Sequence, residues 1–199
     1  MNRNIFFVCC FLAAIGSGVS VSAKSGSLTL VDAYKVDSGF VAIEHQANHL
    51  TVRSIQNLPN NRYVLKKVNF DGRGFQEKET KISNARTFKE VSTPVFKKYE
   101  TVVQHVMNLR GMKNFLLFEE IDLGTEKKAK IFVRPEVPNN FTTKLVLVEH
   151  HSSHEIVFEY GFVDDVSILT MDASAFYFVT IAYCGASSCS SQVNVYKPD

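Results

Sequence analysis

The segment best equipped for chemistry is a histidine cluster in the C-terminal half of the chain. It reads Glu149-His150-His151-Ser152-Ser153-His154-Glu155, so three of the six histidines lie within five positions, with a carboxylate on each side. Imidazole nitrogens bind zinc or copper, and a tight turn could bring two or three of them to one ion. The sequence therefore offers His150, His151 and His154 as a candidate metal site, with zinc as the candidate ion.

Two other interpretations of this cluster stay open. The cluster could be a solvated hairpin loop, because metal sites normally take ligands from more than one segment. Adjacent side chains of a strand also point to opposite faces, so a shared site requires the turn to begin by His150. The third interpretation is pH sensing, since clustered histidines gain charge together as the pH falls from about 7 to 5.

Catalytic motifs are missing elsewhere in the sequence. Glu119-Glu120 and Asp164-Asp165 are adjacent acidic pairs, whose side chains would point to opposite sides of a strand and not converge on a substrate. We expect Asp164-Asp165 to form a solvated turn. The chain has no G-x-S-x-G, H-E-x-x-H, phosphate loop or G-x-G-x-x-G motif. We therefore expect a protein that is not an enzyme and needs no cofactor.

The N-terminus has the pattern of a secretory signal peptide. Arg3 supplies a positive charge, an apolar run covers residues 5–15, and Val21-Ser22-Ala23 fits the small-residue cleavage pattern. The apolar run is too short to cross a bilayer. We expect a signal peptide at 1–23, a secreted extracellular chain from Lys24, and no transmembrane segment after its removal.

Two further features of the sequence fit a secreted protein: a pair of cysteines and a glycosylation sequence. Cys184 and Cys189 are the only cysteines after residue 23, and strand-like sequence on both sides of them predicts a hairpin that brings them together as a disulfide. Asn140-Phe141-Thr142 is an acceptor sequence for glycosylation, which predicts a glycoprotein modified at Asn140.

Composition narrows the class of partner and of fold. The chain of 199 residues has 22 Lys plus Arg against 20 Asp plus Glu, which is too balanced for a nucleic-acid-binding surface. Hydrophobic residues make up 45%, enough for a real core. Sixteen Phe, seven Tyr and no Trp favour packed strands over a helical bundle.

The sequence after residue 23 reads as strands separated by turns, with one helix. Ser92-Thr93-Pro94 offers a helix start, and apolar residues then recur at helical spacing, so we expect an amphipathic helix at 93–109. Period-two alternation and turn residues predict the strands, at residues 27–36, 39–45, 49–56, 62–70, 79–88, 114–122, 129–134, 144–150, 155–162, 166–171, 175–184 and 191–197.

The fold class that follows is mainly β, an antiparallel β-sandwich of jelly-roll-like type. A polar break at residues 124–128 divides the β-rich region 24–199 into parts at 24–123 and 129–199. The second part is small for an independent core. We therefore expect two packed layers or lobes that share one interface.

The run from Lys130 to Lys197 resembles secreted CUB-like modules. The resemblance lies in the order KIFVRPEVPNN, KLVLVEH, DDVSILTMD, FYFVTIAY and QVNVYK. The run lacks the Cys-x-Tyr-Asp element of typical CUB domains, so no calcium-site residue is carried over. The resemblance implies a jelly-roll-like sandwich that binds proteins or glycans outside the cell.

Our leading expectation is a secreted, non-enzymatic protein that recognises a protein, a glycan or a microbial surface. The first alternative is a metal-binding protein or metal-dependent hydrolase centred on the histidine cluster. The second is a carrier of apolar ligands, because Phe-rich sandwiches can open a cavity between their sheets.

Overall fold

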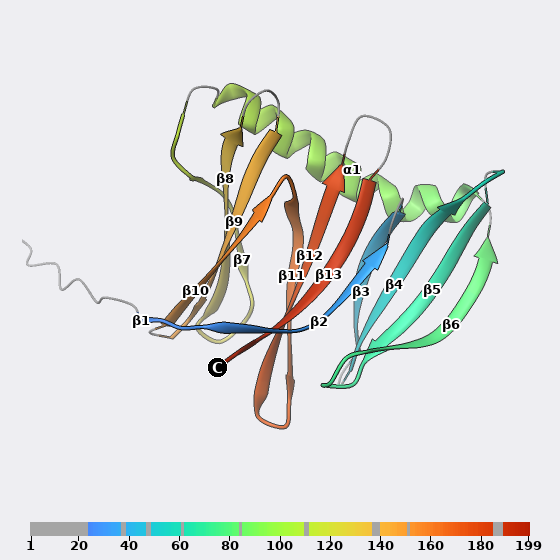
Figure 1. The fold of residues 1–199 in the computed structure, drawn as a ribbon, viewed down its shortest axis with the longest axis horizontal. Helices are drawn as coiled ribbons and strands as arrows, with labels where there is room; N and C mark the ends of the chain where they lie inside the picture. Colours follow the sequence, from blue (N-terminus) through green and yellow to red (C-terminus); the bar gives the residue numbers. More distant parts are fainter. Residues whose placement is uncertain are drawn as a thin grey trace, which may run out of the picture.

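The computed structural model describes residues 24–36, 39–46, 49–60, 62–83, 85–109, 112–136, 140–150, 152–184 and 189–199. The expected signal peptide at 1–23 lies outside these residues. The described residues form three sheets and one helix (Figure 1).

Each sheet is built largely from strands that follow one another in the chain. Sheet A has the order β1 (Lys24–Ser25), β10 (Ser152–Glu159), β9 (Asn140–Glu149), β8 (Lys127–Glu136) and β7 (Leu116–Asp122). Sheet B has the order β11 (Phe162–Met171), β12 (Ser174–Cys184), β13 (Cys189–Pro198) and β2 (Leu28–Val36). Sheet C has the order β3 (Gly39–Gln46), β4 (His49–Leu58), β5 (Arg62–Phe70) and β6 (Phe75–Ser83). All pairings are antiparallel except that of β1 with β10.

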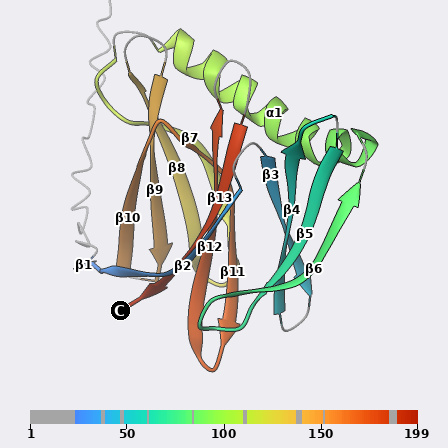
Figure 2. The ribbon, with the colours of Figure 1, turned by 45° about the vertical axis from the view of Figure 1, so that its right-hand side comes forward.

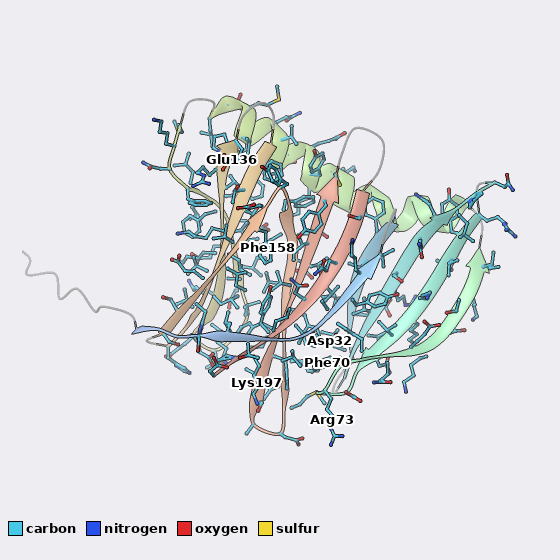
Figure 3. The ribbon with its side chains drawn as sticks, in the orientation of Figure 1. Asp32, Phe70, Arg73, Glu136, Phe158 and Lys197 are labelled. Atoms are coloured by element: carbon cyan, nitrogen blue, oxygen red, sulfur yellow. The ribbon has the colours of Figure 1, made fainter. Side chains whose placement is uncertain are left out.

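Sheet B is the middle layer of the molecule. Alternate side chains of β12 go to opposite faces, so that Tyr177 and Val179 pack into one core with sheet A. Phe176 and Phe178 pack into a second core with sheet C. Figure 3 shows Phe158 in the space between sheets A and B. The prediction of a mainly-β sandwich is confirmed. The sandwich has three sheets because both faces of β12 are apolar, and each face packs against another sheet.

Helix α1 (Ala85–Asn108) runs across one end of all three sheets (Figures 1 and 2). Val102 and Val106 are buried there against Phe40 of sheet C, Phe141 of sheet A and Ala182 of sheet B. The helix therefore closes the ends of both cores.

The helix begins earlier than the sequence predicted. We expected residues 93–109 because proline is favoured in the first turn, but Pro94 lies nine residues after the first residue of α1. The predicted strand at 79–88 is wrong at its C-terminal end, because β6 stops at Ser83 and the helix begins at Ala85. A proline inside a helix costs a backbone hydrogen bond, because it lacks an N–H donor. Burial of the helix face that carries Val102 outweighs this cost.

Sheets A and B each combine strands from the two sides of residues 124–128. In sheet A, β7 pairs with β8, and in sheet B, β2 pairs with β13.

No helix in the described part of the chain has the length and apolar character needed to span a membrane.

Candidate functional site

The histidine cluster is divided between two different environments. His150 lies in the turn between β9 and β10 with a φ of 49°. Its side chain is 55% exposed, and its Nδ1 atom lies 2.6 Å from Oε2 of Glu126. His151 falls outside the described residues. His150 thus forms an exposed contact with the neighbouring hairpin.

His154 is buried on β10. Its residue is 4% exposed, it pairs in register with the core residue Leu147, and its Nδ1 atom has no hydrogen-bond partner. Gly26 lies against its ring. The structure therefore gives His150 and His154 different surroundings, and among the described residues no three His, Cys, Asp or Glu side chains are grouped for a metal ion.

Glu149, the carboxylate before the cluster, has partners of its own. Its Oε2 atom accepts a 2.8 Å hydrogen bond from the Tyr177 hydroxyl, and Lys127 forms an ion pair with Oε1. Burial raises the pKa of Glu149, but the hydrogen bonds from Lys127 and Tyr177 outweigh burial and hold this pKa below its usual value. Burial of the Tyr177 hydroxyl and its hydrogen bond to Glu149 raise the pKa of Tyr177. Glu149 therefore ties sheet A to sheet B.

A charged cluster that the sequence did not predict lies under α1. Nζ of Lys98 is 2.9 Å from Oε2 of Glu119 on β7 and donates a hydrogen bond to the carbonyl oxygen of Asp164 on β11. Both strands carry a β-bulge at this place. Bulges re-aim side chains, and here they bring two strands to one lysine. This arrangement fastens the helix to sheets A and B.

Asp164 is not in the solvated turn that we expected. It lies in β11, and burial raises the pKa of its carboxyl group, with a smaller opposing effect from Lys98. No local pattern in the sequence indicates this cluster, because its members come from three separate elements.

A candidate for ligand binding is a hollow on sheet C, which we call the sheet C hollow. It has a volume of about 340 Å³ and is lined by Arg53, Ser54, Ile55, Leu65, Lys66, Lys67, Glu79 and Lys81. The volume lies at the lower end of the range for small-molecule sites. It is therefore large enough for one small chemical unit.

Strand register explains how the lining is built. Arg53, Lys67 and Glu79 stand side by side on β4, β5 and β6. Ile55, Leu65 and Lys81 form the next row on the same face. The first row is entirely charged, and the second supplies two aliphatic side chains.

This face points away from sheet B. Ser54, between the two rows on β4, points the other way, and its hydroxyl lies 2.8 Å from the Tyr34 hydroxyl of β2. Val52 and Val68 share that inner face and lie in the core with sheet B. The charged row therefore lies on the outer face of sheet C, over an apolar floor in which Ile55 is 3% exposed.

Charges on this face are arranged around Glu79. Lys81 forms an ion pair with Glu79, and Arg53 is 2.8 Å from Glu44 of β3. A hydrogen bond from Lys81, with the charges of Lys81, Lys67 and Arg53, lowers the pKa of Glu79. Lys67, in the middle of the row, has no ion-pair partner within 4.0 Å among the described residues.

The other predicted site residues lie at strand ends. Cys184 and Cys189 are directly opposite each other in the pairing of β12 with β13. Asn140 is the first residue of β9, and the Thr142 hydroxyl of the same acceptor sequence donates a 3.0 Å hydrogen bond to Glu136. The disulfide and the glycan stay predictions from the sequence.

Comparison with known proteins gave no relative for this chain. No family model, no curated protein and no solved structure matches it. The resemblance to CUB-like modules stays a prediction from the sequence.

Proposed function

We propose that this is a secreted, non-enzymatic recognition protein that binds an anionic ligand through the sheet C hollow. The observation that carries the proposal is the combination, on one outer sheet face, of three cations with an apolar floor. Lys and Arg form charge-assisted hydrogen bonds with oxyanions, and these are the stronger class of hydrogen bond.

The two rows of the hollow have different roles in this proposal. Lys67, with Arg53 beside it in the same row and Lys81 in the next row, attracts and holds the anionic group. Ile55 and Leu65 contact the carbon skeleton that carries it. The small volume of the hollow admits one charged unit of a ligand at a time. A polymer is therefore bound through one of its units or through its end.

The scaffold suits recognition because it holds these side chains at fixed spacing. Neighbouring strands lie about 4.8 Å apart, so one register row places three charges in a line. The other face of sheet C packs into a core with sheet B, which keeps the sheet in place. The signal-peptide pattern and the CUB-like resemblance support an extracellular setting.

The test is binding of the secreted protein to immobilised anionic and neutral polymers, measured by surface plasmon resonance. We expect binding to anionic polymers only, weaker with rising salt because salt screens exposed charges. Lys67→Gln should weaken it by about fivefold or more, on the scale of a charge-assisted contact. Lys113→Gln is the matched control, since Lys113 is exposed before β7, outside the hollow. Equal loss in both variants, or no binding, would contradict the proposal.

A further inference from the structure

We infer that the ligand of the sheet C hollow is a sulfate-ester group on an acidic glycan, and that Glu79 competes with it for the same cations. This inference rests on the function proposed above and names the ligand class of that site. It follows from the position of Glu79, from the geometry of the donors and from the shape of the hollow.

Glu79 stands where an anionic ligand would have to bind. Its carboxylate pairs with Lys81, and the charges of Lys67 and Arg53 also act on it. An incoming oxyanion needs the same donors, so it must displace this carboxylate. The Glu79 side chain can move aside, because 47% of it is accessible to solvent.

A β-bulge is the reason why Glu79 occupies this face. The register of β5 and β6 pairs Lys67 with Glu79 but Val68 with Glu77, which leaves Lys78 as an extra residue. Without the bulge, Glu79 would share the inner face with Glu77 and the core residue Phe75. Glu77 instead pairs with Lys66, 3.2 Å away, and accepts a hydrogen bond from Thr80.

The donors favour a tetrahedral oxyanion over a carboxylate. Arg53, Lys67 and Lys81 come from three different strands and form a triangle on one face, two in one register row and the third in the next. A carboxylate has two oxygens in one plane, whereas a sulfate ester offers three oxygens that diverge and keeps its charge at all physiological pH values. A sulfate ester can therefore satisfy all three cations at once.

The shape of the hollow favours a glycan over a lipid surface. The floor of Ile55 and Leu65 is less exposed than the charged rim, since Ile55 is 3% exposed and the side chain of Arg53 is 58% exposed. A single sulfated sugar unit can enter and rest its carbon face on this floor, whereas a flat bilayer would touch only the rim. The occupant we assign is a sulfated polysaccharide.

The experiment compares three polymers with one backbone: dextran, carboxymethyl-dextran and dextran sulfate, the last two at matched charge density. Vesicles containing phosphatidic acid are the lipid arm. Wild type, Glu79→Gln and Glu77→Gln are compared by surface plasmon resonance. Glu77→Gln is the matched control, because it removes the same charge from the same strand on the opposite face of sheet C, where Glu77 pairs with Lys66 and not with Arg53, Lys67 or Lys81.

We expect wild type to bind dextran sulfate more tightly than carboxymethyl-dextran, and dextran not at all. Glu79→Gln should bind dextran sulfate about fivefold more tightly, since it loses a competitor and a repulsive charge. Glu77→Gln should change affinity by less than about twofold, because its charge is farther away and screened. Circular dichroism melts confirm that the three proteins are folded.

Three outcomes would overturn the inference. Equal gains in Glu79→Gln and Glu77→Gln would show a general charge effect and refute competition by Glu79. Equal binding of the two anionic dextrans would refute the preference for sulfate, and equal binding of the vesicles would refute the glycan. In each case the proposed anion binding survives, whereas wild type that binds none of the four probes refutes the proposed function itself.

Discussion

Gly26 lies directly against the imidazole ring of His154: a Cβ atom placed on Gly26 would come within 2.3 Å of Cε1 and 2.9 Å of Nδ1. The backbone N–H of Gly26 donates a 3.2 Å hydrogen bond to the Ser153 carbonyl, just after the parallel pairing of β1 with β10. Beyond it, the hydroxyls of Ser27 and Thr29 donate hydrogen bonds to the Asp199 carboxylate. The N-terminal segment can pass this close to His154 only because residue 26 has no side chain.

Gly26→Ala should therefore destabilise the protein. We expect a loss of about 1–3 kcal/mol in the free energy of unfolding, the usual cost of overpacking a filled site. Urea denaturation followed by circular dichroism measures it. The control is the same substitution in a His154→Ala background, where the ring is absent and the added methyl group should cost much less. An equal loss in both backgrounds would show that the contact with His154 is not the cause.

The two described histidines of the cluster should respond differently to substitution. His154→Ala should cost about 2 kcal/mol or more because it removes a buried side chain, whereas exposed His150→Ala should cost less than about 1 kcal/mol. Thermal melts with zinc and with chelator test the metal alternative. A shared zinc site would give a stabilising shift that both variants lose, and we expect wild type to show no such shift.

Asp164→Asn should stabilise the protein at neutral pH. Burial raises the pKa of Asp164 above its value in the unfolded chain, so the folded state disfavours the carboxylate. The penalty is absent below the unfolded pKa of about 3.9, grows as the pH rises, and is complete above the raised folded pKa. The gain in unfolding free energy should therefore be present at pH 7 and shrink towards pH 3. Urea titrations across this range check it, and a gain that does not depend on pH would contradict it.

Pro94→Ala should also raise stability. Pro94 lies in the interior of α1, where proline is up to about 3 kcal/mol less favourable than alanine. We expect a gain of about 1–3 kcal/mol in urea denaturation. A loss of stability would show that the helix needs the proline, for example because it depends on a bend at this position.

The secreted protein should contain no free thiol at residues 184 and 189. The register of β12 and β13 places these cysteines opposite each other, and secretion supplies an oxidising route. Alkylation without reductant, followed by intact mass spectrometry, should add no label. Replacing both cysteines with serine should cost about 2 kcal/mol, the entropic effect of a short closed loop. Two labelled thiols in the native protein would refute the bridge.

Local patterns in the sequence were enough to predict most strands. The strand at 62–70 has the predicted bounds, and Tyr177, Val179 and Ile181 share one face of β12 as their alternation indicates. These features depend on neighbouring residues, since turns and period-two burial leave a direct mark on the sequence. The start of α1 was missed because Pro94 is a local signal that tertiary burial overrode.

The sequence by itself determined that this chain forms amphipathic strands, where most of them begin and end, and which side chains share a face. Only the tertiary structure decided that sheet B would be covered on both faces and that Lys98 would meet Glu119 and Asp164. It also placed Arg53, Lys67 and Glu79 in one row, next to the row that holds Ile55 and Leu65. Residues far apart in sequence become neighbours through strand register, and a single β-bulge, which leaves no local pattern, moves Glu79 from one face of the sheet to the other.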